Sequence, residues 1–169
     1  MSEPQESTMG SAVTVVAEEQ NSLSHIARTT IAALASQLIA QSLHMPEPYW
    51  ATVTAIVVMQ SSLGAAWTVS WKRLAGTVLG GAVGGFLSSY VGANLIVFGA
   101  AMAGTGLVCL LLKVDRSAYR FAGITLTIIM LVPRATSPWI VAIHRCVEVS
   151  LGIAVALVLT AMWPERIPS

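Results

Sequence analysis

The sequence predicts an all-α fold, a polytopic transmembrane bundle of about six helices. Hydrophobic residues make up 55% of the chain and charged residues only 10%, whereas soluble domains carry about 25% charged residues. The apolar residues also fall into successive segments with short breaks between them. Because so few charges cannot cover a soluble surface, a bilayer is the expected solvent.

The 169 residues divide into a membrane domain flanked by two tails. Residues 1–24 hold glutamates but no lysine or arginine, so they lack the positive region of a secretory signal. We expect a disordered cytoplasmic tail there, the membrane domain over residues 25–164, and a cytoplasmic tail over residues 165–169. Each segment of the domain can cross a hydrocarbon core of about 30 Å. The expected spans are Ile26–Leu43, Tyr49–Trp67, Leu74–Val91, Asn94–Leu112, Phe121–Trp139 and Ile140–Trp163.

Basic residues between the segments predict the orientation, because cytoplasmic loops collect lysine and arginine. The alternate breaks, after the first, third and fifth segments, carry only Arg134. Both termini are therefore expected on the cytoplasmic side of an inner, or plasma, membrane. The basic residues that place the second and fourth breaks inside are Lys72, Arg73, Lys113, Arg116 and Arg120.

A faint internal repeat emerges when the chain is shifted by 72 positions. Each copy would hold three helices, so the second copy would insert upside down, and inverted repeats place transporter sites at their interface. One arginine of the repeat is then expected near the inner face and its equivalent near the outer face. The most informative aligned pairs are Trp67 with Trp139, Arg73 with Arg145, and Gly80 with Gly152.

Arg145 is the most informative single residue, because ionisable residues inside a membrane segment usually face a cavity or a partner. Glu148 lies three positions further on, on the same helical face. One interpretation is an anion-binding or gating site in which Glu148 or His144 carries a proton. The other is a structural ion pair that holds the bundle together.

Three further sites combine charge or polarity with a break in an apolar segment. Arg73 begins the third segment and either extends to the interface or forms a cationic vestibule. Arg134 follows Pro133, which marks either a kinked element or an outer loop. The polar break from Gln60 to Gly64 either exposes backbone to a substrate or ends a shorter helix.

Other patterns indicate packing rather than chemistry. Gly76, Gly80 and Gly84 form GxxxG steps, which bring helices close together within or between chains. A polar stripe of glutamines and histidine in the first segment predicts hydrogen bonds between helices: Gln37, Gln41 and His44. Because the sequence contains no catalytic constellation, metal spacing or nucleotide motif, we expect neither an enzyme nor a cofactor.

Residues 49–81, YWATVTAIVVMQSSLGAAWTVSWKRLAGTVLGG, resemble the fusaric-acid-resistance and aromatic-acid-exporter group of membrane proteins. The similar features are the aromatic start, the Q-x-S-L-G-A-type break and the step from Arg73 to Gly80. The end of the last segment at Trp163 is also similar, so the resemblance covers roughly residues 28–165. Plant aluminium-activated malate channels are distant relatives of this group. The chain departs from larger members in lacking a cytosolic domain or second membrane half, and in having Ser61-Ser62 where proline is common.

The resemblance implies export or conduction of organic anions such as aromatic carboxylic acids. The short chain then favours a homodimer or higher homo-oligomer, and a periplasmic adaptor is an allowed partner. The sequence contains no run of lysine and arginine of the kind that binds nucleic acid, so no nucleic-acid partner is expected. The alternative function is a non-transporting accessory or scaffold subunit of the membrane.

Overall fold

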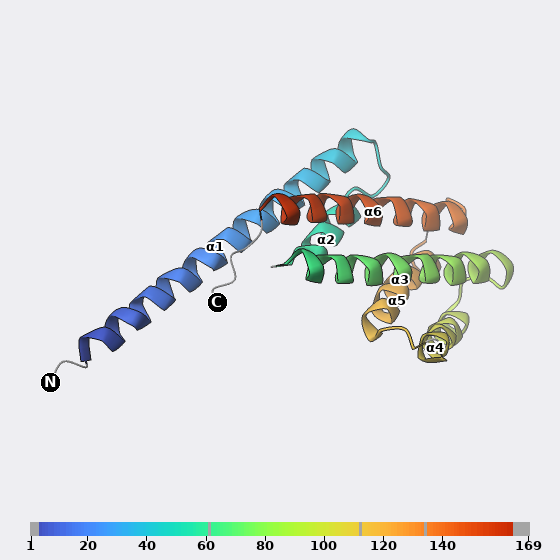
Figure 1. Ribbon diagram of the computed structural model, residues 1–169. Helices are drawn as coiled ribbons and strands as arrows, with labels where there is room; N and C mark the ends of the chain where they lie inside the picture. Colours follow the sequence, from blue (N-terminus) through green and yellow to red (C-terminus); the bar gives the residue numbers. More distant parts are fainter. Residues whose placement is uncertain (1–3, 61, 112, 134, 164–169) are drawn as a thin grey trace.

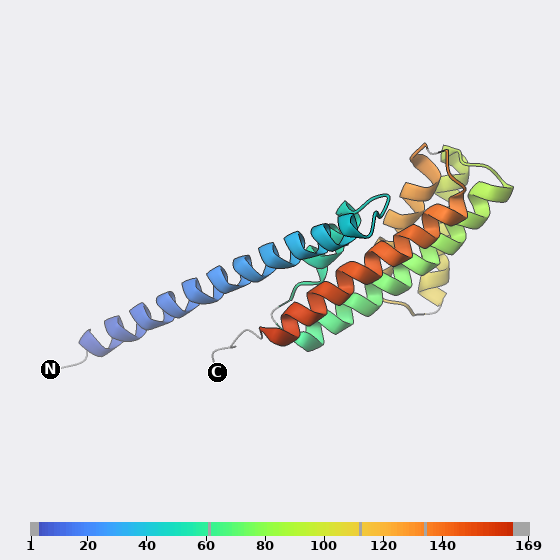
Figure 2. The same cartoon turned by 90° about the horizontal axis from the view of Figure 1, so that it is seen from above.

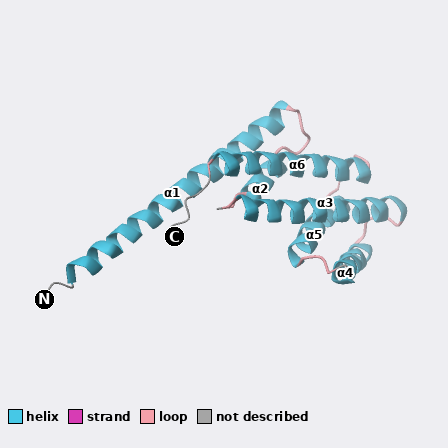
Figure 3. Ribbon diagram, in the orientation of Figure 1, coloured by secondary structure: helices cyan, strands magenta, loops and turns pink. Residues whose placement is uncertain are grey.

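The computed structural model describes residues 4–60, 62–111, 113–133 and 135–163. Over these ranges it contains six α-helices and no strand (Figures 1 and 3), which confirms the predicted all-α bundle. The helices are α1 (Pro4–Ser42), α2 (Tyr49–Val58), α3 (Leu63–Tyr90), α4 (Leu95–Leu111), α5 (Arg116–Leu131) and α6 (Pro138–Met162).

Helices α3 and α6 form the centre of the fold and run side by side in opposite directions (Figures 1 and 2). Gly81 faces Ala142 and Gly85 faces Trp139, so positions rise along one helix as they fall along the other. The shorter α2 packs on α6, and the shorter α5 packs on α3. Helices α1 and α4 complete the bundle by packing on α2 and α5.

The second predicted span is wrong in its boundaries. Helix α2 ends at Val58, and α3 begins at Leu63 rather than at Leu74. The new helix starts here because Met59 is extended and the Ser62 side chain accepts a hydrogen bond from the Ala65 amide at 3.2 Å. With 10 residues, α2 is only about 15 Å long. Arg73 consequently lies in the third turn of α3 instead of in a loop before it.

The first helix also differs from its prediction, since α1 begins at Pro4 where a disordered tail was expected through residue 24. Proline suits the first position of a helix, and residues 5–24 contain no further proline and many residues of good helix propensity. The N-terminal part of α1 extends away from the bundle (Figure 2). The tail expected at residues 165–169 lies outside the described residues.

The other helices lie close to the predicted segments. Helices α4 and α6 match them to within a few residues, whereas α5 starts at Arg116 rather than Phe121 and ends at Leu131 rather than Trp139. The side chain of Asp115 caps α5 by accepting a hydrogen bond from the Ser117 amide at 2.8 Å. The helix stops at Leu131, ahead of Pro133, because proline cannot donate to the helical ladder.

Among the described residues, α6 is the one helix both long and apolar enough to cross a bilayer by length and composition. Helices α2 and α4 are apolar but shorter. Helix α3 has the length, with 28 residues, but it carries Lys72 and Arg73 within its first half. A bundle of six complete spans therefore stays a prediction.

Glycines set the closest approaches between long and short helices. A Cβ on Gly76 or Gly80 would overlap the backbone of α5 at Ala118 or Ala122, and Gly84 lies against Ile129 of the same helix. On the other side, a Cβ on Gly152 of α6 would overlap the carbonyl of Ala51 in α2. The GxxxG steps of α3 thus pack within the chain.

The arrangement of the helices is compatible with the inverted repeat. A shift of 72 positions carries α2 into α5 and α3 onto α6. It also relates the Gly80 contact with α5 to the Gly152 contact with α2. Each long helix of one half therefore packs on the short helix of the other half.

Candidate functional site

Helix α2 is the meeting point of the two repeat arginines. Arg73 of α3 donates a hydrogen bond from Nε to Thr54 Oγ1 at 3.1 Å. Arg145 of α6 places its guanidinium carbon 3.7 Å from the centre of the Trp50 ring. Trp50 and Thr54 are one helical turn apart on α2, so the two arginines contact neighbouring turns of the same short helix. We call Trp50, Thr54, Arg73, Arg145 and Glu148 the arginine site.

The two arginines were expected near opposite membrane faces, and that expectation is wrong. Both lie inside the bundle, with exposed fractions of 3% for Arg73 and 1% for Arg145. Because α3 begins at Leu63, Arg73 lies about 15 Å along the helix axis from its first residue. Antiparallel packing of α3 and α6 then brings the arginines to the same short helix.

Arg145 has a carboxylate partner on its own helix. Its Nη1 lies 3.7 Å from Glu148 Oε2, and both side chains are almost fully buried. Glu148 Oε1 also accepts a hydrogen bond from the backbone amide of Glu47 at 3.2 Å, just before α2 begins. An acidic group near the first amides of a helix is favoured by the helix dipole. The predicted Arg145–Glu148 pair is therefore present, and it also holds the start of α2.

Arg73 has different surroundings. Its guanidinium carbon lies 4.9 Å from the centre of the Phe121 ring of α5. Within the described ranges, no carboxylate forms an ion pair with Arg73, and Nε is the only nitrogen of its side chain that donates a hydrogen bond. The two terminal nitrogens of Arg73 therefore have no hydrogen-bond acceptor among the described residues.

The two arginine–ring contacts follow the repeat. Arg73 contacts Phe121 near the start of α5, and Arg145 contacts Trp50 near the start of α2. The shift of 72 positions relates the arginines and relates Phe121 to Tyr49, the neighbour of Trp50. Cation–π contacts of this kind stabilise a desolvated guanidinium by about 2 kcal/mol.

Arg28 is a third buried arginine, with an exposed fraction of 1%, and the sequence analysis missed it. Its Nη2 donates to the backbone carbonyl of Gln60 at 3.2 Å and lies 3.7 Å from Met59 Sδ. Gln60 therefore contributes its backbone, as the polar break suggested, but its contact is Arg28 rather than open space. The signal that could have found Arg28 was a charge within the first apolar segment.

The remaining candidates lie away from the arginine site or outside the described residues. His144 is half-buried and has no charged partner among the residues that the structure describes. Arg134 lies outside them. In the polar stripe, Gln37 Oε1 accepts a hydrogen bond from Thr52 of α2 at 2.7 Å. Gln41 and His44 are exposed.

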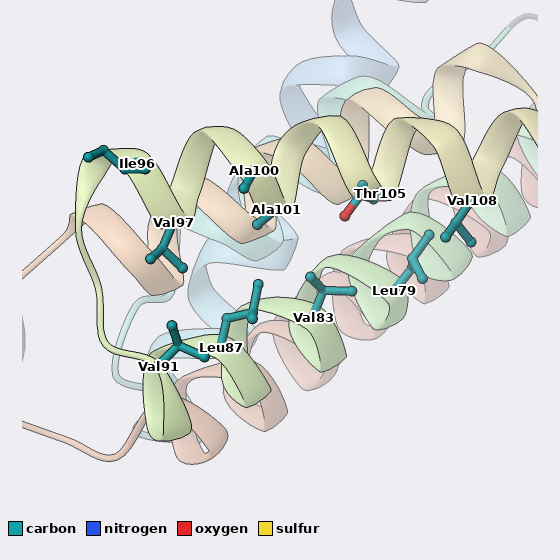
Figure 4. Close-up of a pocket in the computed structure, with 11 residues that line it drawn as sticks. Leu79, Val83, Leu87, Val91, Ile96, Val97, Ala100, Ala101, Thr105 and Val108 are labelled. Atoms are coloured by element: carbon teal, nitrogen blue, oxygen red, sulfur yellow. The ribbon is translucent and has the colours of Figure 1, made fainter.

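An apolar groove lies apart from the arginine site. It lies between α3 and α4, has a volume of about 490 Å³, and is lined by side chains such as Leu79, Val83 and Val97 (Figure 4). A second groove of about 280 Å³ lies between α3 and α6 around Trp139 and Cys146. Neither groove contains Arg73 or Arg145. The described residues also contain no cluster of side chains that could hold a metal ion.

An ion pair ties α3 to the loop before α5. Lys72 Nζ lies 2.7 Å from Asp115 Oδ2. The hydrogen bond from Lys72, aided by the Ser117 amide, lowers the pKa of the Asp115 carboxyl to about 2. Asp115 therefore stays ionised in nearly all conditions and keeps both its ion pair and its helix cap.

The comparisons with known proteins give the family context. The fusaric acid resistance protein-like family matches residues 31–159, which include every residue of the arginine site. The chain is 28% identical to the inner membrane protein YeeA of Escherichia coli over 144 residues, which are 84% of the chain. It spans only 41% of the length of that relative. No solved structure matches the chain.

Proposed function

Because the chain belongs to the fusaric acid resistance protein-like family, we propose that it spans a bacterial inner membrane several times and moves organic anions, exporting acids such as aromatic carboxylates. The inner membrane relative supports the location. The arginine site supports the sign of the solute, since buried guanidinium groups select anions. Both termini are proposed to face the cytoplasm.

One observation carries the proposal: Arg73 is a buried cation whose partners within the described residues are a neutral hydroxyl and an aromatic ring. An arginine in a membrane segment costs about 2.5–3.5 kcal/mol on insertion scales. A structural arginine offsets that cost with a carboxylate, as Arg145 does with Glu148. Arg73 lacks such a carboxylate and is therefore available to bind a transported anion reversibly. Its planar guanidinium can bind a carboxylate with two hydrogen bonds.

The two arginines then take different roles. Arg73 binds the anion first, and Arg145 provides a second positive charge nearby that raises the local anion affinity. Thr54 orients Arg73 through its hydroxyl, which donates its own proton to the Trp50 carbonyl at 2.8 Å. The chain has no nucleotide motif, so the solute follows a gradient.

The test is flux of a panel of aromatic and dicarboxylic acids into proteoliposomes of the purified chain. Arg73→Gln removes the buried charge, and Lys72→Gln removes the neighbouring charge that pairs with Asp115 at the surface. We expect wild type and Lys72→Gln to carry the same acids and Arg73→Gln to lose at least ~90% of the flux. Protein-free liposomes give the passive rate of each acid.

Accessory or scaffold function is the alternative outcome of the same experiment. Absence of flux in wild type, with the protein folded and inserted, would favour a subunit that needs a partner. The chain spans only 41% of the length of its relative, which is consistent with a subunit that needs a partner. We also propose that the chain acts as a homo-oligomer, which cross-linking in native membranes would test; a periplasmic adaptor is a further candidate for capture there.

A further inference from the structure

The apolar groove between α3 and α4 is open to the outside of the bundle, because α4 packs mainly on α5. Of the eleven described residues that line it, Thr105 alone is polar (Figure 4). Leu79 and Val91 mark its two ends on α3 and lie about 18 Å apart along the helix axis. That length exceeds half of a hydrocarbon core of about 30 Å, so the groove is long enough to hold a lipid chain of one leaflet.

Basic residues gather where α4 ends and α5 begins. Lys113 lies just after α4, Arg116 and Arg120 lie in the first turns of α5, and all three are exposed. Lys72 of α3 joins them, since its Nζ lies 2.7 Å from Asp115, the residue before Arg116. We call Lys72, Lys113, Arg116 and Arg120 the basic cluster. Asp115 adds one negative charge to these four positive charges, so the cluster attracts anions.

The basic cluster meets one end of the groove. Lys72 precedes Leu79 by seven positions, which is two helical turns, so both lie on the same face of α3. Tyr119, among the basic residues of α5, donates a hydrogen bond to the Met102 carbonyl of α4 at 3.4 Å. The start of α5 therefore lies against α4. In the proposed orientation this end of the groove is the cytoplasmic end.

Thr105 places an unsatisfied hydroxyl in the groove. It has an exposed fraction of 3%, and its Oγ1 has no hydrogen-bond partner among the described residues. Other buried threonines, such as Thr77 and Thr125, donate to the carbonyl four positions earlier. In Figure 4 the Thr105 oxygen points toward α3, across the groove. Because an unpaired polar group in apolar surroundings is costly, a ligand of the groove should carry a hydrogen-bond acceptor.

We propose that the groove and the basic cluster together bind one anionic phospholipid of the cytoplasmic leaflet. Its phosphate lies at the basic cluster, one acyl chain lies along the groove, and an ester carbonyl accepts the hydrogen bond of Thr105. Each lysine or arginine near an anionic headgroup raises the affinity about fivefold. The choice of leaflet rests on the proposed location and orientation of the chain, whereas binding of the lipid is independent of the proposed transport.

The experiment measures lipid binding to the purified full chain by native mass spectrometry from detergent. Dioleoyl phosphatidylglycerol is the anionic probe, and phosphatidylcholine with the same chains is the neutral one. We expect wild type to bind one phosphatidylglycerol about tenfold more tightly than phosphatidylcholine. Glycerol phosphate carries the charge without a chain, and it should bind at least ~100-fold more weakly than phosphatidylglycerol.

Gly104→Leu is the variant that fills the groove. Gly104 lines the groove, and a Cβ there meets nothing within 4 Å, so leucine enters it without overlapping the protein. Gly99→Leu is the matched control, because Gly99 is equally open on the same helix but does not line the groove. The affinity for phosphatidylglycerol should fall at least ~tenfold in Gly104→Leu and stay at the wild-type value in Gly99→Leu.

The double variant Lys113→Gln with Arg116→Gln examines the headgroup separately. It should lower the affinity for phosphatidylglycerol at least ~tenfold and leave that for phosphatidylcholine unchanged. Equal binding of the two lipids to wild type would overturn the anionic headgroup. Equal affinities in Gly104→Leu and Gly99→Leu would overturn the groove as the site of the chain.

Three further results would assign the groove or the cluster to another occupant. Glycerol phosphate that binds as tightly as phosphatidylglycerol would show a phosphate site without a lipid. Dimers that Gly104→Leu alone dissociates would show that a second copy of the chain fills the groove. Loss of aromatic acid flux in Gly104→Leu with unchanged lipid binding would assign the groove to the solute. Because binding is measured without flux, a chain that transports nothing still tests the lipid site.

Discussion

Gly80 of α3 and Gly152 of α6 occupy equivalent positions of the two halves, and each faces a carbonyl oxygen of the other half's short helix. Gly80 faces Ala122 of α5, and Gly152 faces Ala51 of α2. Both contacts are so close that a methyl group does not fit. The two crossings fix the short helices on the central pair, and through them the position of Trp50 and Thr54 in the arginine site.

Gly80→Ala is therefore expected to destabilise the protein by about 1–3 kcal/mol, because the new methyl group would overlap backbone rather than a movable side chain. Thermal unfolding in detergent measures the change. Gly99→Ala is the control, since a Cβ there meets nothing within 4 Å. Equal midpoints for the two variants would contradict the close contact.

The sequence was sufficient to predict the class of fold and several elements. Long apolar runs located α4 and α6, and the spacing of Arg145 and Glu148 predicted their ion pair. The repeat skeleton also selected Arg73, Arg145 and both crossing glycines. Local patterns can do this because helices and i, i+3 pairs depend on nearby residues.

The rest depended on contacts between distant segments. The end of a shorter helix at the polar break was one of the two interpretations of the sequence, but the start of α3 at Leu63 follows from one capping hydroxyl, that of Ser62. Trp50 and Phe121 lie against buried arginines of other helices, and these contacts join residues far apart in the sequence. Arg28 pairs with a carbonyl 32 positions away, which no local pattern indicates.

Arg28→Met is expected to lower the free energy of unfolding by about 1–3 kcal/mol, because the Gln60 carbonyl loses a charged donor while the packing volume is kept. Chemical denaturation in detergent measures the loss. Arg116→Met is the control, since Arg116 is exposed. A loss in Arg116→Met equal to that in Arg28→Met would show that the hydrogen bond from Arg28 to the Gln60 carbonyl adds no stability of its own.

The Lys72–Asp115 ion pair predicts a loosening of the α4–α5 connection at acid pH. The pKa of Asp115 is lowered from 3.8 to about 2 by its contacts, so the stabilisation is complete above the unfolded value and is lost as pH falls through the folded value. The protection of the amides in the first turn of α5 against hydrogen exchange, taken relative to their intrinsic exchange rates, should fall as pH falls from about 4 to 2. Asp115→Ala, which removes both the ion pair and the cap, should show low protection at every pH. A wild-type profile unchanged over this window would refute the role of the pair.

The two ends of α5 test whether the bundle spans the membrane as proposed. Lys113 precedes α5 and Ser137 follows it, and both are exposed. Helix α5 has 16 residues and is about 24 Å long, short of the hydrocarbon core of about 30 Å, so its flanking residues must complete the crossing. With Cys109 and Cys146 replaced by alanine, Lys113→Cys should react with an impermeant thiol reagent only from the cytoplasmic side. Ser137→Cys should react only from the outside; labelling of both positions from one side would mean that α5 does not cross, and the predicted orientation would fail with it.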